Sequence, residues 1–174
     1  MATEILRPNA AGDYTNITTQ YPASTYHWDK VDEASSDDDT TYIEVPGTSE
    51  LRDVFHLGAS SIPTGSTINS VTVYHNCRAT VPLNPAYFRP LLRLGTSETL
   101  GTVISTTSTT YTLQSEALVR PGGGSWSVAD LANLQVGIGL YAQIDTKASR
   151  CTQVYVVVDY TPAAVGFSRG FIIG

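Results

Sequence analysis

The chain has 174 residues, of which 41% are hydrophobic and 15% charged, and its net charge is −6. This length and composition predict one globular domain rather than a disordered chain. The acidic balance and the presence of only two lysines, Lys30 and Lys147, argue against the basic surface that nucleic acid requires. No apolar run is long enough for a membrane-spanning helix, and the first residues lack a signal-peptide pattern, so we expect synthesis in a cytosol.

Segments rich in Thr, Val and Tyr recur along the chain and are separated by Gly and Pro turn signals, which predicts an all-β protein. In chain order, the predicted strands are 3–7, 13–19, 40–45, 51–57, 68–81, 86–94, 100–106, 109–119, 134–144 and 151–160. Pro90 predicts an edge strand or a bulge. The connections are unequal in length, which favours an antiparallel β-sandwich of jelly-roll type over an up-and-down barrel.

One short helical turn is predicted near 127–134. Ser127 can cap it, Asp130 stands at the capping-box position, and Trp126 is expected to pack into the core beside it. The preceding Pro121–Gly124 loop is glycine-rich, but no Lys-Ser/Thr pair follows it, so a phosphate-binding P-loop is excluded.

Six of the sixteen carboxylates lie between Asp29 and Asp39. The favoured interpretation is a solvated polar loop, because like charges in a Ser-rich segment are usually hydrated. The alternative is a Ca²⁺ site with Asp37, Asp38 and Asp39 as weak candidate ligands, although the spacing is not that of an EF-hand. No metal and no other cofactor is favoured.

Aromatic side chains gather between positions 14 and 28. The cluster comprises Tyr14, Tyr21, Tyr26 and Trp28, of which Tyr21, Tyr26 and Trp28 are the candidates for a glycan platform, because sugars stack on exposed aromatic rings. The alternative is that these rings pack on the sheet with their polar atoms at the rim.

The two cysteines, Cys77 and Cys151, are predicted to be free thiols. Cytosolic synthesis disfavours a disulfide, and the alternation of apolar residues places the two on opposite faces unless a bulge intervenes. The three histidines stand alone and no nucleophile elbow is present, so no catalytic site is predicted.

The last residues differ in character from the rest of the chain. We divide the chain into a sandwich domain, 1–162, and an apolar C-terminal arm, 163–174, which either returns to its own sandwich or docks on a neighbouring subunit. The arm residues expected to contact a partner are Phe167, Arg169, Phe171, Ile172 and Ile173.

Patterns of core and turn residues across 4–162 resemble a known group of proteins. They are Leu6–Asn9, Asp32–Tyr42, Ile68–Tyr74, Leu91–Gly95, Trp126–Leu131 with Leu134–Gly137, and Thr152–Tyr160. Together they resemble the jelly-roll virion structural proteins of tailed bacteriophages, which serve as capsid decoration or cement-like subunits or as tail-appendage proteins.

The resemblance implies a non-enzymatic virion protein made in the host cytoplasm. Its expected partners are the major capsid protein or other virion subunits, and a homo-oligomer, with a trimer favoured. Our leading hypothesis is an outer capsid decoration protein that stabilises the shell, and the alternative is a carbohydrate- or receptor-binding module of a tail appendage. Neither a nucleic acid nor a membrane is an expected partner.

Overall fold

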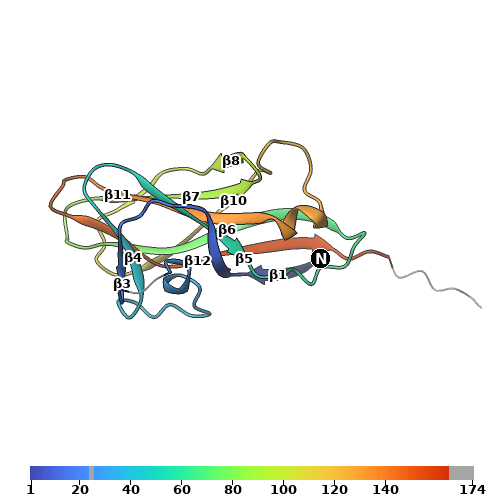
Figure 1. Cartoon of the computed structure of the whole chain (residues 1–174), viewed down its shortest axis with the longest axis horizontal. Helices are drawn as coiled ribbons and strands as arrows, with labels where there is room; N and C mark the ends of the chain where they lie inside the picture. Colours follow the sequence, from blue (N-terminus) through green and yellow to red (C-terminus); the bar gives the residue numbers. More distant parts are fainter. Residues whose placement is uncertain (24–25, 165–174) are drawn as a thin grey trace, which may run out of the picture.

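The computed structural model describes residues 1–23 and 26–164. The predicted contact residues of the arm, Phe167 to Ile173, lie outside these ranges. The described chain forms two antiparallel sheets packed face to face (Figure 1).

The first sheet, sheet A, has the strand order β10-β6-β12-β4-β3, and β1 also pairs with β12. Its strands are β1 (Ala2–Leu6), β3 (Thr19–Tyr21), β4 (Tyr42–Pro46), β6 (Thr67–Ala79), β10 (Thr112–Leu118) and β12 (Ala148–Thr161). The second, sheet B, has the order β2-β5-β11-β7-β8, with β9 also on β7. Its strands are β2 (Pro8–Thr15), β5 (Leu51–Leu57), β7 (Ala86–Leu94), β8 (Ser97–Leu100), β9 (Ile104–Thr106) and β11 (Leu134–Ala142).

From β4 onward the chain passes back and forth between the sheets. Strands β4, β6, β10 and β12 belong to sheet A, whereas β5, β7, β8, β9 and β11 belong to sheet B. The last two strands insert into the middle of the sheets, β11 between β5 and β7, and β12 between β6 and β4. This is the arrangement of two Greek keys that defines a jelly roll, so the predicted fold is confirmed.

The core lies between the sheets and follows the alternation of side chains along the strands. In β11, Leu134, Val136, Ile138 and Leu140 point inward, and all are almost fully buried. Trp126 packs against this core, as predicted. The described helices are short: η1 (Trp28–Lys30) and η2 (Val128–Ala132) are both 3₁₀ turns, and neither could cross a bilayer.

The helix η2 has the predicted capping box. The Ser127 hydroxyl accepts from the Asp130 backbone N–H, and the Asp130 carboxylate accepts from the Ser127 N–H at 2.8 Å. Hydrogen bonds from Arg120 are the largest influence on the pKa of Asp130, which is lowered to about 2. The turn predicted near 127–134 is therefore present and shorter than expected.

Of the two alternatives predicted at Pro90, the edge strand is wrong, because β7 lies inside sheet B with partners on both sides, whereas the bulge agrees with a one-residue shift in the outer pairing at this point. Along the side of β7 that faces away from β11, residues up to Phe88 pair with β9 and residues from Leu91 onward pair with β8. Pro90 falls in the gap between these two ladders, where the missing N–H interrupts neither of them.

The N-terminal segment alternates between the sheets. In sheet A, β1 pairs with β12 and β3 with β4, and in sheet B, β2 pairs with β5. Asp53 of β5, which is fully buried, anchors this crossover. Its carboxylate accepts from the backbone N–H groups of Asn16 and Ile17 at 2.7 and 2.8 Å, and lies 2.6 Å from the His27 ring. The sequence around Asp53 gave no sign of these long-range contacts.

Candidate functional site

Strand β2 leaves its partner and crosses the outer face of sheet B. Ala11 is opposite Phe55, and Thr15 is opposite Asp53, so three residues, Gly12–Tyr14, lie between pairs that are only two positions apart on β5. We call Gly12–Tyr14 the bridge. A Cβ on Gly12 would lie 2.6 Å from the Val54 carbonyl oxygen, so the backbone can pass this close only with glycine.

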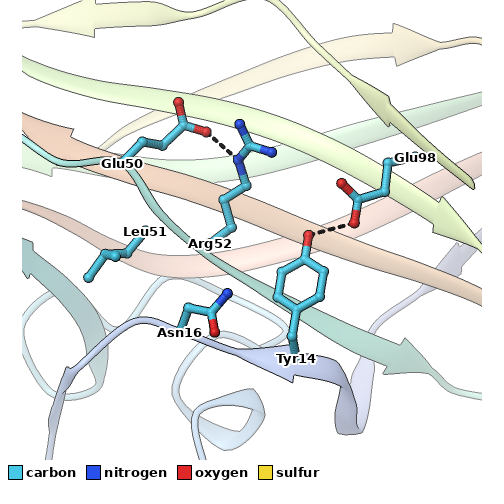
Figure 2. A pocket seen from close by; sticks show the side chains of 6 residues that line it. All are labelled: Tyr14, Asn16, Glu50, Leu51, Arg52 and Glu98. Atoms are coloured by element: carbon cyan, nitrogen blue, oxygen red, sulfur yellow. Dashed lines mark hydrogen bonds and ion pairs between the residues drawn. The ribbon is translucent and has the colours of Figure 1, made fainter. Parts of the chain in front are cut away.

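The bridge is held to distant strands by hydrogen bonds and ion pairs. The Asp13 backbone N–H donates to the Gln135 side chain on β11 at 2.8 Å, and the Asp13 carboxylate pairs with Arg93 on β7 at 2.7 Å. The Tyr14 hydroxyl donates to Glu98 on β8 at 2.8 Å, as Figure 2 shows. These contacts fix the Tyr14 ring above the sheet.

The same contacts shift the pKa values of the bridge. The pKa of Asp13 is lowered, mainly by its hydrogen bond with Arg93. The pKa of Tyr14 is raised by burial and by the Glu98 carboxylate. The Arg93 guanidinium also lies 5.6 Å from the centre of the Tyr14 ring. At neutral pH the bridge therefore presents a neutral phenol between charged groups that are already paired.

Two glycines of β11 shape the floor beneath the bridge. Gly139 is in register with Arg52 on one side and Arg89 on the other. The Glu50 side chain occupies the space above it, where a Cβ would lie 2.7 Å from the Glu50 carboxylate. Glu50 contacts both arginines, through the Arg52 Nε and, at 3.5 Å, an Arg89 terminal nitrogen. The Arg89 Nε is buried without a hydrogen-bond partner within the described part of the chain.

The other glycine, Gly137, lies under a small apolar patch separate from the main core. A Cβ there would be 2.8 Å from Val54 and 2.9 Å from Leu91, and both of those side chains are fully buried. The hydrophobic cluster between the sheets includes neither side chain. The outer face of sheet B is therefore covered by packed side chains and is not a bare sheet surface.

A basin of about 500 Å³ opens between the bridge and the start of β5. It is lined by Tyr14, Asn16, Glu50, Leu51, Arg52 and Glu98 (Figure 2). A second hollow of about 450 Å³ borders the bridge at Asp13 and Gln135 and extends to Arg120 and Asp130. The bridge therefore stands between two hollows, and the first combines an aromatic ring with carboxylate, amide and guanidinium groups.

The residues predicted to form a glycan platform lie in two pairs of aromatic rings. Tyr21 stacks on Tyr42 with ring centres 5.5 Å apart, whereas Tyr26 lies against Trp28 at 6.0 Å. Tyr21 and Tyr26 are each about half exposed, but Trp28 packs against the core. The three candidates therefore belong to two ring pairs, and none of them lines the basin.

The three candidate metal ligands point to different partners. Asp37 accepts hydrogen bonds from the hydroxyls of Thr41 and Thr152, and Asp38 is exposed in a left-handed conformation. Asp39 pairs with two arginines, Arg78 and Arg150. Among the residues that the structure describes, no three His, Cys, Asp or Glu side chains are grouped to hold a metal ion.

Positions 34–36 and 38–40 are exposed, as the favoured interpretation of a solvated loop predicts, and Asp39 anchors this loop to the sandwich. Burial alone would raise its pKa, but hydrogen bonds from Arg78, Tyr111 and Arg150 lower it below the usual value. Ion pairs therefore anchor the acidic segment to the outer face of sheet A, while most of the loop stays exposed to solvent.

The pattern of glycines and arginines on two neighbouring strands is a weak indication of the basin in the sequence. Gly137 and Gly139 alternate on one strand, and Arg89 and Arg93 occupy outward positions on its neighbour. Alternating glycines in a central strand indicate a close approach from outside the sheet. The partners of these residues, such as Tyr14 and Glu98, are far away in sequence and could not be paired in advance.

No protein-family profile matches the chain, and no curated protein matches it. Among solved structures, one described as "Family 16 Carbohydrate Binding Module-2" is similar, with a TM-score of 0.43 and 11% sequence identity. The similarity covers 84% of this chain and 89% of that chain. At this TM-score and identity it carries no inference about what this chain binds.

Proposed function

We propose that this protein is a non-enzymatic binding module that recognises carbohydrate in the basin beside Tyr14. The observation that carries the proposal is the composition of that basin: one aromatic ring, two carboxylates, an amide and a guanidinium around an open hollow. Its volume of about 500 Å³ falls in the range of small-molecule sites.

The chemistry of these groups suits a sugar. Neighbouring hydroxyl groups of a sugar ring can donate to one carboxylate and accept from one guanidinium, and the less polar face of the ring can lie against Tyr14. Glu50 is already held between Arg52 and Arg89, and Tyr14 is held by Glu98. Because these side chains are ordered before binding, little conformational entropy is lost when the ligand arrives.

A glycan array followed by calorimetry on any hit tests the proposal. Glu50→Gln and Tyr14→Ala are each expected to weaken binding by about tenfold or more, since each removes a direct contact worth at least 1.4 kcal/mol. Asn69→Ala, on β6 of sheet A and outside the basin, is the matched control and should bind like the parent. A chelator should change nothing, because no metal cluster exists among the described residues.

Either of two outcomes would overturn the proposal. If no glycan binds, or if a glycan binds with the same affinity to the parent, Glu50→Gln and Tyr14→Ala, the basin is not a carbohydrate site. Circular dichroism of each variant distinguishes a lost contact from a lost fold.

A second candidate function is the virion structural role that the sequence resemblance implies, with a capsid decoration or cement subunit as its leading form. The observation that supports it is a set of exposed apolar side chains on or beside strands at the margins of sheet A. Ile5 on β1 and Leu113 on β10 are 53% and 50% exposed, and Val119, just after β10, is 72% exposed. Apolar groups at such positions are ready to be covered by a protein partner.

Cosedimentation with phage capsids that lack decoration subunits tests this role. Saturable binding that Leu113→Ser with Val119→Ser weakens would support it, with Asn84→Ala, in the segment before β7, as the control. Failure to bind under conditions in which the chain is folded would remove the capsid role and leave the tail-appendage form of the carbohydrate proposal.

A further inference from the structure

A bulge in β12 changes which face of sheet A Cys151 occupies. Cys151 is in register with Cys77 on β6, but Gln153 is in register with Asn76, so Thr152 is an extra residue on β12. Side chains on either side of the extra residue no longer alternate regularly. Cys151 therefore faces the core together with Cys77, and the predicted placement on opposite faces is wrong.

The acidic segment holds the bulge in place. The Thr152 hydroxyl is 2.7 Å from the Asp37 carboxylate, and the Gln153 side-chain amide donates to the Glu33 carbonyl oxygen at 2.6 Å. The backbone N–H of Val154 donates to the Val31 carbonyl oxygen at 2.8 Å. Consecutive residues of β12 are thus anchored outside the sheet, and this anchoring sets the register of the two cysteines.

The two thiols are buried and adjacent. Cys77 is 1% exposed and Cys151 is not exposed at all. Residues directly opposite each other on antiparallel strands have Cα atoms about 4.5–5.5 Å apart, which lies within the range of about 4.4–6.8 Å found for disulfides. Both are free thiols in the structure. Burial, and then a hydrogen bond with the Cys151 thiol, raise the pKa of Cys77.

We propose that Cys77 and Cys151 are a disulfide-forming pair that can link β6 covalently to β12. Both strands lie inside sheet A, and β12 comes last in chain order among the described strands. The bond would therefore fasten the strand that completes the jelly roll.

The reaction requires an oxidant, which we take to be a small-molecule disulfide such as oxidised glutathione. One cysteine thiolate attacks it, forming a mixed disulfide and releasing one glutathione thiol. The second cysteine thiolate then attacks the protein-bound sulfur and releases the second glutathione. The protein loses two protons and two electrons in total, and the oxidant is reduced to two thiols.

The structure also indicates when exchange is fastest. A thiolate is the attacking species, and the buried Cys77 thiol in the folded chain resists ionisation. The neighbouring His75, whose ring nitrogen lies 3.5 Å from the Cys77 sulfur, has a pKa lowered to about 4 by burial and is neutral. Exchange is therefore expected while β12 is still undocked, and slow once the sandwich has closed.

Oxidative refolding tests the proposal. The full chain is reduced and unfolded in guanidinium chloride, then refolded in parallel with a glutathione redox buffer or with dithiothreitol. In the redox buffer we expect the intact mass to fall by two hydrogen atoms, no free thiol in denaturant, and a peptide map that joins Cys77 to Cys151. The midpoint of thermal unfolding should rise by roughly 5–10 °C relative to the reduced protein.

Cys77→Ala and Cys151→Ala are the matched controls, and neither should show the mass loss or the rise in midpoint. The proposal is overturned if the parent refolds to the native circular dichroism spectrum in redox buffer but retains two thiols or carries glutathione. It is also overturned if the native spectrum returns only in dithiothreitol, because the disulfide would then be incompatible with the fold.

Discussion

The carboxyl group of Glu33 has a strongly raised pKa. Burial raises its pKa to about 7, although hydrogen bonding from the Thr41 hydroxyl at 2.6 Å works in the opposite direction. Its other carboxylate oxygen is buried and has no hydrogen-bond partner in the described structure. The folded protein therefore favours the protonated form of Glu33.

This preference makes stability depend on pH in a definite direction. The folded pKa of Glu33 is above its ordinary value of 4.5, so its contribution to stability is full below that value and is lost as the pH rises through about 7. Glu33→Gln is expected to unfold at a temperature close to that of the parent at pH 5 and at a higher temperature at pH 8. Thermal scans from pH 4 to pH 9 measure this, and parallel curves for the two proteins would contradict it.

Gly137 is the residue at which a single methyl group should matter most. A Cβ would lie 2.4 Å from the Asp53 carbonyl oxygen, and backbone cannot move aside cheaply. We expect Gly137→Ala to lower the free energy of unfolding by about 2 kcal/mol, measured by urea denaturation. Gly58→Ala is the control, because its Cβ would meet only one atom, at 3.9 Å, and it should change stability much less.

At the scale of elements, the sequence predicted strands well and their departures from regularity poorly. The ranges expected for β5 and β7, 51–57 and 86–94, are those of the structure. The bulge at Thr152 was left open as an alternative but could not be predicted, because the side on which each side chain lies was inferred on the assumption of unbroken pairing. What breaks the pairing is Asp37, more than a hundred residues away. The bridge was missed for the same reason, since Tyr14 and Glu98 are 84 residues apart.

The candidate site shows the same limit more strongly. The aromatic cluster in the sequence included Tyr14, which lines the basin, but the platform was assigned to Tyr21, Tyr26 and Trp28, which belong to two ring pairs. The basin instead combines residues from β2, β5 and β8, and only strand order brings them together.

The crossover between β2 and β3 should depend on one buried carboxylate. Asp53→Ala would leave the backbone N–H of Ile17 without its acceptor and that of Asn16 with only the Arg52 carbonyl oxygen at 3.2 Å, and it would remove the hydrogen-bond partner of the His27 ring. We expect a loss of about 3 kcal/mol in the free energy of unfolding and faster proteolysis near these residues. Asp159→Ala is the control on the surface of sheet A. Equal stability of the two variants would show that the crossover does not depend on Asp53.

At the scale of the whole molecule, the proposed virion role makes a prediction about mass in solution. Light scattering of the full-length chain should give a trimer if the protein is a symmetric virion subunit, and a chain shortened to 1–164 should keep the circular dichroism spectrum of the sandwich. A folded, monomeric parent would count against a trimeric subunit and would favour carbohydrate binding in the basin beside Tyr14 as the function.

The pairing of the first and last strands has a mechanical consequence. Ala2 is opposite Tyr160 and Leu6 is opposite Val156, so the beginning of β1 lies beside the end of β12 (Figure 1). A force that pulls residue 2 away from residue 161 would load these backbone hydrogen bonds one after another rather than together. β1 should therefore peel away from β12 at low force, while the remaining strands of the sandwich stay folded.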